Sequence, residues 1–390
     1  MIETEILVAG GGIAGMSAAA RLASLGREVT LVDPAPAGGG TPDLRTTAFL
    51  QPAIETLEHS GAWAGMAGDA APLKTMRLVD AGGRERVVRK TADFNSAEVI
   101  DRPFGFNVAN AAIRAALTAR LDEAGVRYLH QVAVFGTVER TQTRIARLSD
   151  GRQVSARLVI AADGRDSALR QMAGLTARRW HYGQKALVFA VGHDAPHEGV
   201  STEIHRTGGP LTLVPMPDEG GRPRSSVVWM VPGPKAARLA QLGPEALGAE
   251  LTAETMDLFG ALDVLGPHAV WPIIGQLATR LTAPRLALIA EAAHVIPPIG
   301  AQGLNMSLKD VETLAHLIGA AEDPGSAQIL SPYQARRWPD MAARVAGVDV
   351  LNRAAQAEWQ PLRDLRHLGL SAIHDIPPIR RLAMKLGLGA

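Results

Sequence analysis

The sequence of 390 residues contains no cysteine. This absence excludes disulfide bonds, cysteine nucleophiles, iron–sulfur clusters and cysteine-ligated zinc, and it is typical of a reducing compartment. The chain also lacks an excess of charge of one sign, because 40 lysines and arginines face 39 acids and leave a formal net charge of +1. No basic run is long enough for a nucleic-acid surface, so we predict neither a nucleic-acid partner nor a metal site.

Aromatic residues are also scarce, at 4% of the chain, so we expect any ligand pocket to be mainly aliphatic. No apolar run reaches the roughly 20 residues of a membrane-spanning helix. The first strand begins almost at once and carries Glu3 and Glu5, so we expect no signal or transit peptide. These features predict a cytoplasmic protein, with any membrane contact peripheral and at the inner face.

Glycine, by contrast, occurs in one informative arrangement. Residues 6–9 form an apolar run, followed by Gly10, Gly12 and Gly15 and then by small residues typical of a helix. This spacing allows a tight turn, lets the backbone approach a pyrophosphate and packs the helix close to its strand. A second strand ends in Asp33, about 20 residues on, where a carboxylate can take ribose hydroxyls. We therefore predict a dinucleotide site in preference to a plain strand–helix turn.

Two later segments also combine a buried strand with a polar turn. A strand over 158–162 is followed by Asp163, which either caps the next helix or contacts a ligand at the carboxyl end of the strand. A strand over 286–290 is followed by a long irregular turn before the next helix. We expect the amides of Leu304 and Asn305 to point outward there and to bind an anion or a carbonyl group.

Several polar residues near these turns have two interpretations. Arg45, in a segment over 43–50 that is predicted to begin a helix, either pairs with Asp43 or reaches a pyrophosphate. Asn110 is predicted to cap the helix that follows it. His294 is more simply interpreted as a satisfied structural group than as a base, because its neighbours are small and apolar.

The region over 181–271 has alternating apolar and polar residues, strong turn signals and one predicted helix over 244–259. A similar, partly alternating pattern also predicts a hairpin that turns at 81–83. The fold class is therefore α/β with an α+β insert, a discontinuous Rossmann-like domain interrupted by an antiparallel β-sheet. The predicted segments are 1–73, 98–180 and 272–345 for the first domain, 74–97 and 181–271 for the inserted sheet, and 346–390 for a C-terminal helical tail.

The last predicted helix, over 379–388, places apolar residues at helical spacing beside cations. It either docks on the body of the protein or lies on a membrane surface. The apolar residues are Ile379, Leu382, Ala383 and Leu386, and the cations are Arg380, Arg381 and Lys385.

Three motifs in this order resemble the single-component FAD-dependent aromatic hydroxylases, the para-hydroxybenzoate hydroxylase group. They are Gly10-x-Gly12-x-x-Gly15, Ala162-Asp163-Gly164-Arg165-x-Ser167, and Glu291-Ala292-Ala293-His294 followed by Pro297-Pro298 and Gly303-Leu304-Asn305. Within that group the chain is most similar to the aerobic ubiquinone-biosynthesis hydroxylases. The motifs for that similarity are Asp43-x-Arg45-x-x-Ala48-x-Leu50, Gly209-Pro210-x-x-Leu213-x-Pro215 and Tyr333-x-x-x-Arg337-x-Pro339.

The resemblance, which covers essentially the whole chain, implies FAD as cofactor, O₂ as co-substrate and NAD(P)H as a transient reductant. In the family, reduced FAD and O₂ form a C4a-hydroperoxide whose distal oxygen attacks an electron-rich ring, so the cofactor carries the chemistry. The implied cofactor-binding residues are Gly10, Gly12, Ile13, Ala14, Gly15, Asp33, Arg45, Asn110, Asp163, Glu291, Gly303, Leu304 and Asn305. Pro298 is implied to lie beside the reacting edge of the flavin.

One position departs from the family pattern. The late motif normally contains Gly-Asp, and this chain has Ala290-Glu291 instead. The longer Glu291 carboxylate can still reach a ribityl hydroxyl if the backbone retreats by about a methylene, but the methyl group of Ala290 narrows the approach of the cofactor. FAD affinity is the property that this departure would affect.

The inserted sheet is expected to form the substrate wall. The apolar candidates are Leu213, Met216 and Trp229, and the polar candidates are Tyr182 and Gln184. The favoured function is hydroxylation of the aromatic ring of a ubiquinone precursor, a polyprenylphenol, with other quinone-biosynthesis proteins as candidate partners. Two alternatives stay open: hydroxylation of a small soluble phenol, and a flavin-binding scaffold subunit of a quinone-biosynthesis assembly.

Overall fold

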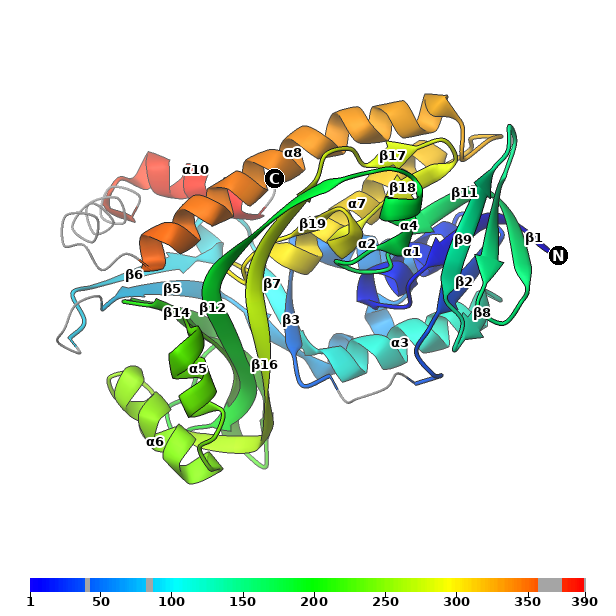
Figure 1. The fold of residues 1–390 in the computed structure, drawn as a ribbon. Helices are drawn as coiled ribbons and strands as arrows, with labels where there is room; N and C mark the ends of the chain where they lie inside the picture. Colours follow the sequence, from blue (N-terminus) through cyan, green and yellow to red (C-terminus); the bar gives the residue numbers. More distant parts are fainter. Residues whose placement is uncertain (39–42, 82–86, 357–373, 389–390) are drawn as a thin grey trace.

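Two eight-stranded β-sheets and one three-stranded sheet carry the chain in the computed structural model, which describes residues 1–38, 43–81, 87–356 and 374–388 (Figure 1). In Figure 1 the first large sheet lies to the right and the second to the left. The long helix α8 (Ala327–Gln356) runs across the top of both. The predicted combination of a Rossmann-like part with an added β-sheet is confirmed.

The first sheet is built around parallel strands. β1 (Ile2–Ala9) lies between β2 (Val29–Asp33) and β11 (Gln153–Ala161), and it pairs with both in parallel. β11 pairs onward in parallel with β18 (Leu286–Leu288). The last four residues of β1 are buried, as expected for an interior strand of a parallel sheet. The remaining strands are β8 (Arg127–His130), β9 (Val134–Glu139), β10 (Arg144–Leu148) and β17 (Thr282–Ala283).

Helices with small or apolar inner faces cover this sheet. α1 (Ile13–Ala23) packs against α3 (Asn110–Glu123) and α7 (Gln302–Ile318), and its buried alanines allow close approach. α2 (Gln51–Ser60) contacts both α1 and α7. α4 (Ala168–Met172) is a short helix that follows β11. Segments from both ends of the chain therefore share one core.

The second sheet contains two strands of 16 residues, β12 (Ala177–Gly192) and β16 (Asp263–Ala278), which pair antiparallel. Both run without a break through the predicted domain boundaries at 180–181 and 271–272. β5 and β13 pair in parallel, so the sheet is mixed and not wholly antiparallel as predicted. The other strands are β5 (Thr75–Asp80), β6 (Lys90–Asn95), β13 (Val200–Arg206), β14 (Gly209–Glu219), β15 (Arg222–Pro232) and β19 (His294–Val295).

One face of the second sheet is covered by two helices, α5 (Gly233–Leu239) and α6 (Pro244–Glu254). Only the second was predicted, and it ends five residues before the expected 259. β5 and β6 form the predicted hairpin, while the turn of that hairpin at 82–86 lies outside the described residues.

The third sheet corrects a prediction. Residues 46–50, expected at the start of a helix, form β3 (Thr46–Leu50), and the helix α2 begins only at Gln51. Two β-branched threonines and a fully buried Phe49 favour the strand, which pairs antiparallel with β7 (Gly105–Ala109). β4 (Ala70–Leu73) pairs with the other edge of β7.

The tail begins with α8 and continues to α10 (Pro377–Leu388), with residues 357–373 and 389–390 outside the described part. No helix among the described residues is both long and apolar enough to cross a membrane. Short 3₁₀ turns complete the fold: η1 (Trp63–Gly65), η2 (Ala67–Asp69), η3 (Ser96–Glu98) and η4 (Ala290–Ala292).

A buried polar cluster fixes the late turn against two helices. Asp310 of α7 is fully buried, and its Oδ2 accepts the Ala290 N–H at 3.1 Å and lies 3.0 Å from His294 Nε2. Its Oδ1 accepts a hydrogen bond from Arg337 Nε of α8 at 2.8 Å. Because every member is buried and paired, the cluster holds the turn in one position. His294 is therefore part of a structural network, as its surroundings suggested.

Replacement of Arg337 by methionine removes one partner of a buried ion pair. The Asp310 carboxylate then keeps only Ala290 and His294, and we expect a loss of about 3 kcal/mol in the free energy of unfolding. Arg102→Met, which breaks an exposed pair with Glu55, is the matched control and should change that free energy by less than about 1 kcal/mol. Urea unfolding measures both, and equal losses would contradict the assignment.

Candidate active site

The first glycine turn combines two close backbone contacts with one open position. A Cβ on Gly10 would lie 2.2 Å from the Ala162 carbonyl oxygen, and the φ of Gly10 is +112°, so only glycine fits there. A Cβ on Gly15 would lie 1.9 Å from the Gly10 carbonyl oxygen. A Cβ on Gly12 would have no atom within 4 Å. Gly12 therefore faces open space at the start of α1, which fits a phosphate group.

The amino end of α1 supplies donors to the same space. Ile13 and Ala14 are its first two residues, so their backbone amides have no partner within the helix. Arg114 of α3 donates a hydrogen bond to the Gly11 carbonyl oxygen at 3.0 Å and brings a guanidinium to the turn. Sequence reasoning missed Arg114, although its position four residues after Asn110 places both on one helix face.

Asp33, the last residue of β2, bonds to the glycine turn that follows β1. Its Oδ2 accepts the Gly11 N–H, and its Oδ1 accepts the Ala35 N–H at 2.6 Å. Burial and the nearby charge of Asp33 raise the pKa of the Tyr128 hydroxyl to about 12, so this hydroxyl stays protonated at neutral pH. Each Asp33 oxygen keeps a second lone pair, which is available to a ribose hydroxyl.

Asp163 bonds to the first turn of α4, whose N-cap is Ser167, and it also carries a free acceptor. Its Oδ2 accepts the Leu169 N–H at 3.0 Å in the first turn of α4. Its Oδ1 is buried and has no hydrogen-bond partner among the described residues. An unpaired buried carboxylate oxygen is costly, and a cofactor hydroxyl is a suitable donor for it. Asp163 thus fits the place that the resemblance gives it.

The late motif contains Ala290 and Glu291 where the family pattern has Gly-Asp. Ala290 has a φ of +53°, in the left-handed region that favours glycine. The Glu291 carboxylate is about half exposed, and its Oε2 lies 3.2 Å from Arg165 Nε. This pair connects the late motif to the middle motif, so the longer side chain has a partner within the protein.

The turn into α7 lies next. Gly300 and Ala301 both have positive φ, of +60° and +55°, and α7 begins directly after them. Gly303 and Leu304 therefore lie in its first turn, where backbone amides are free. A Cβ on Gly303 would have no atom within 4 Å, so this position is also open. Pro298 is exposed on the turn.

The Asn305 side chain bonds to the backbone on both sides of the turn. Asn305 lies in the first turn of α7, and the outward backbone amide expected of it, like that of Leu304, stays a prediction. Its Nδ2 donates to the Ala301 carbonyl oxygen at 2.6 Å. Its Oδ1 accepts the Leu50 N–H and its Nδ2 donates to the Ala48 carbonyl oxygen, both at 2.8 Å. Asn305 thus ties α7 to β3.

Arg45 shows the ion pair that was one of its two interpretations. Its Nε and terminal nitrogen donate to the two Asp43 carboxylate oxygens at 2.7 Å each. Burial alone would raise the pKa of Asp43, but hydrogen bonds from Arg45 and Asn110 hold that pKa below its ordinary value. The guanidinium also lies 5.0 Å from the centre of the Trp271 ring, which belongs to the second sheet. Arg45, which directly precedes β3 of the third sheet, therefore also contacts the second sheet.

Asn110 is the first residue of α3, and the cap position belongs to Ala109, which corrects the predicted cap. The Asn110 side chain instead donates to Asp43 and accepts from the Thr47 hydroxyl, each at 2.8 Å. β7 runs directly into α3, and the helix begins at Asn110 itself, one residue earlier than a cap at this position requires. Its amide now supports the Asp43 carboxylate that holds Arg45.

Two substrate candidates lie on the wrong face of the second sheet. Leu213 and Trp229 are almost fully buried in the cluster beneath α5 and α6, away from the glycine turns. Adjacent residues of a strand point to opposite faces, so Met230 points the other way from Trp229. The opposite face carries a smaller apolar cluster: Ala186, Val188, Met230 and Ile273 with Ile299 of the late turn and Val348 of α8.

The polar candidates face α8. The Tyr182 hydroxyl donates to Asp349 Oδ1 at 2.6 Å, and Gln184 Oε1 accepts from Asn352 Nδ2 at 3.0 Å. Gln184 is buried and also donates to the Gly208 carbonyl oxygen. Met216 of β14 is partly exposed. These contacts make Tyr182 and Gln184 connections between the second sheet and α8.

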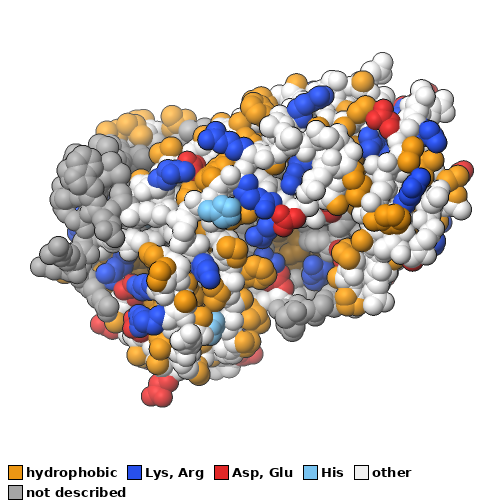
Figure 2. All heavy atoms as spheres, viewed as in Figure 1, with side chains coloured by type: hydrophobic (Ala, Val, Ile, Leu, Met, Phe, Trp, Pro, Cys, Tyr) orange, Lys and Arg blue, Asp and Glu red, His pale blue; other side chains and the backbone are white. Residues whose placement is uncertain are grey.

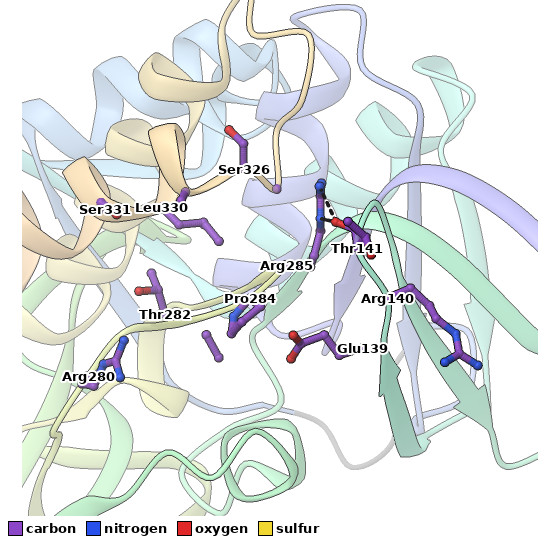
Figure 3. A pocket seen from close by; sticks show the side chains of 13 residues that line it. Glu139, Arg140, Thr141, Arg280, Thr282, Pro284, Arg285, Ser326, Leu330 and Ser331 are labelled. Carbon is purple, nitrogen blue, oxygen red and sulfur yellow. Dashed lines mark hydrogen bonds between the residues drawn. The ribbon is translucent and has the colours of Figure 1, made fainter.

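A surface cavity of about 630 Å³ lies at a different place, bordered by the start of β18 (Figure 3). Figure 3 shows Arg285 bonded to the Thr141 carbonyl oxygen on one side, with Arg280 and Glu139 along the rim. Ligands of open α/β sheets bind at the carboxyl ends of the strands, and this cavity lies at the amino ends. It is therefore separate from the three turns.

The chain matches a protein family and several known proteins along most of its length. The model of a family described as FAD binding domain matches residues 3–347. The chain is 33% identical to the ubiquinone hydroxylase UbiL of Rhodospirillum rubrum, over 99% of this chain and 89% of that protein. It is 29% identical to the 3-demethoxyubiquinol 3-hydroxylase of Escherichia coli, over 99% and 98%. The structure of the p-nitrophenol 4-monooxygenase PnpA from Pseudomonas putida has the same fold, with a TM-score of 0.81, 18% identity and 100% and 99% coverage.

The fold and the three convergent turns define a Rossmann-type flavoprotein. The chain belongs to the FAD binding domain family and, with its ubiquinone hydroxylase relatives, to the FAD-dependent aromatic monooxygenases. The open spaces beside Gly12 and Gly303 and the unpaired Asp163 oxygen fit FAD. These residues would hold its phosphates, the end of its ring system and its ribityl chain.

The glycine turn predicts different outcomes for two neighbouring glycines. Gly12→Ala adds a methyl group to open space, so folding should be retained while affinity for FAD falls about tenfold or more, or ~1.4 kcal/mol. Gly10→Ala forces a clash at positive φ and should cost more than about 2 kcal/mol of stability. Thermal unfolding of the FAD-free proteins and titration with FAD separate the two effects. Equal behaviour of both variants would contradict the assignment.

The Arg45–Asp43 pair allows a second test of cofactor contact. If Arg45 turns to the pyrophosphate when FAD binds, Arg45→Met should weaken FAD binding by about ten- to a hundredfold, the worth of a hydrogen bond between charged groups. Asp43→Asn frees the guanidinium and should leave the affinity equal or higher. Quenching of flavin fluorescence measures both. Unchanged affinity in Arg45→Met would show that Arg45 does not contact FAD and makes only the ion pair with Asp43.

Proposed function

We propose that this chain hydroxylates the aromatic ring of a ubiquinone precursor that carries a polyprenyl tail. The observation that supports this most is the likeness, over 99% of the chain, to two proteins named as hydroxylases of ubiquinone or its precursor. Both relatives are matched along most of their own length, so the likeness includes the second sheet as well as the FAD-binding part.

The face of the second sheet that is turned toward the late turn suits such a substrate. Ala186, Val188 and Met230 on this face are aliphatic or thioether side chains, and they pack with Ile299 beside Pro298. An isoprenoid tail is bound through apolar contact and needs no polar partner along its length. We propose this set as the substrate wall, in place of Leu213 and Trp229.

FAD, when bound and reduced, would supply the electrons that activate O₂, and O₂ would be the source of the oxygen atom that is transferred. The protein supplies position and exclusion of water. The amides at the start of α1 and of α7 would hold the two ends of the cofactor, and Asp163 Oδ1 would accept a hydroxyl between them. Pro298, exposed on the turn between the late motif and α7, is proposed to line the place where the ring of the substrate reacts.

NAD(P)H is the proposed reductant, and it would visit the site only briefly. The sequence has no second glycine fingerprint after a strand, so no separate nicotinamide domain is predicted. A contact with the inner face of a membrane is part of the same proposal, because a polyprenylated substrate resides there.

Chemically reduced, FAD-loaded protein tests the substrate without assuming the electron donor. After O₂ is admitted, a short-chain prenylated phenol should gain one oxygen atom, seen by mass spectrometry, in a yield well above that of the same phenol without its tail. The proposed wall gives the reason, since only the prenylated compound covers it. Met230→Glu places a charge in this buried cluster and should lower the yield with the prenylated phenol at least about tenfold, while the yield with the phenol that lacks the tail, which reports a folded and FAD-loaded protein, is retained.

Trp229→Phe, on the opposite face of the same strand, is the control and should keep its preference for the prenylated phenol. Turnover of the soluble phenol with no reaction of prenylated phenols would overturn the proposal in favour of a small soluble substrate. A protein that binds FAD and consumes neither compound would favour the scaffold alternative.

A further inference from the structure

α10 presents its apolar residues outward. Ile379 and Leu382 are 42% and 58% exposed, and Ile376 just before the helix is 44% exposed. These three residues follow one another at intervals of three, so they form a single stripe along one side of the helix. A helix that docks on a protein body normally buries such a stripe.

Polar contacts attach α10 to the body instead. Arg380 pairs with Glu98 of η3 at 2.7 Å, and Lys90 of β6 pairs with Asp375 at 2.8 Å. The less exposed side chains of the helix are Arg380, Ala383 and Met384, so this side meets the protein, while Ile379 and Leu382 lie on the other side. The docking interpretation of the sequence does not explain why Ile379 and Leu382 stay exposed.

Cations and further apolar side chains accompany the stripe. Arg381 and Lys385 are exposed on the same helix, next to Leu382. Val350 and Leu351 near the end of α8 are 65% and 55% exposed. Among the residues that the structure describes, eleven large apolar side chains are exposed, and five of them fall within 350–356 and 374–382. Figure 2 shows apolar side chains along the edge of the molecule where Figure 1 places α10.

We propose that α10 and the end of α8 form a docking surface for an anionic lipid membrane. An amphipathic helix with apolar side chains on one side and flanking cations is the arrangement that lies in a membrane interface. Each exposed cation near the surface adds attraction to anionic headgroups. The proposal rests on the proposed function, because it gives a membrane-resident substrate its route to the site.

The position of α10 beside the site supports this route. Gln302, the first residue of α7, accepts a hydrogen bond from Arg344 of α8 at 3.0 Å and faces the Gly387 carbonyl oxygen of α10 at 3.4 Å. Gly303 and Leu304, the predicted flavin contacts, follow directly. The docking surface therefore adjoins the turn where the substrate is proposed to react.

Vesicle flotation of the FAD-loaded full chain tests the surface without turnover. The protein should float with vesicles of phosphatidylcholine and phosphatidylglycerol, and much less with phosphatidylcholine alone. Ile379→Asp combined with Leu382→Asp should lower the partition coefficient about tenfold or more. Arg381→Gln combined with Lys385→Gln should lower it about fivefold per charge and weaken its dependence on salt. Leu258→Asp, at an apolar residue 44% exposed just beyond α6, is the matched control and should bind as the wild type does.

Three outcomes would overturn the proposal. The wild type could fail to float with anionic vesicles, or the Ile379 and Leu382 variant could float equally well. Hydrogen exchange of the protein without vesicles could also show that the amides of α10 are protected, which would mean that something else covers the stripe. Light scattering would then distinguish a dimer, in which a second copy covers it, from coverage by residues 357–373 of the same chain. Hydroxylation of a water-soluble phenol should be equal in all variants. Normal flotation without hydroxylation of a prenylated phenol would reject the proposed function and leave the docking surface standing.

Discussion

The parallel pairing of β11 with both β1 and β18 is the constraint on which the rest of the structure depends. It places the ends of three strands, which lie far apart in the sequence, at one edge of one sheet. The contact of Gly10 with the Ala162 backbone leaves no room for any side chain between the first two. The three motifs that the sequence predicts to bind FAD can meet only because these strands are neighbours.

The late turn needs more support than the other two, since it contains two residues at positive φ that are not glycine, Ala290 and Ala301. The buried Asp310 cluster holds its beginning, and the Asn305 side chain holds its end against β3. Each fastening ties the turn to a different layer of the protein. A site built from distant segments is in this way kept in one geometry before a cofactor arrives.

The sequence predicted the parts of this site that depend on local rules. The glycine spacing predicted the first turn, because a close approach of two backbone segments admits few residue types. The end of the strand over 158–162 predicted the position of Asp163. Features that depend on partners were missed or wrong. Residues 46–50 form a strand because β7 lies beside them, and the Asn305 side chain bonds to the backbone of β3, which lies about 255 residues earlier in the sequence. Trp229 and Met230 differ by one residue and face opposite sides, which no apolar count distinguishes.

Hydrogen–deuterium exchange on the FAD-free protein, before and after addition of FAD, tests most directly whether the three segments form one site. The structure predicts slower amide exchange on binding at residues 10–16, 163–169 and 300–306 together. Residues 280–285, which border the cavity at the other edge of the sheet, should be unchanged. Slowing confined to the first segment, or absent from all three, would contradict the account.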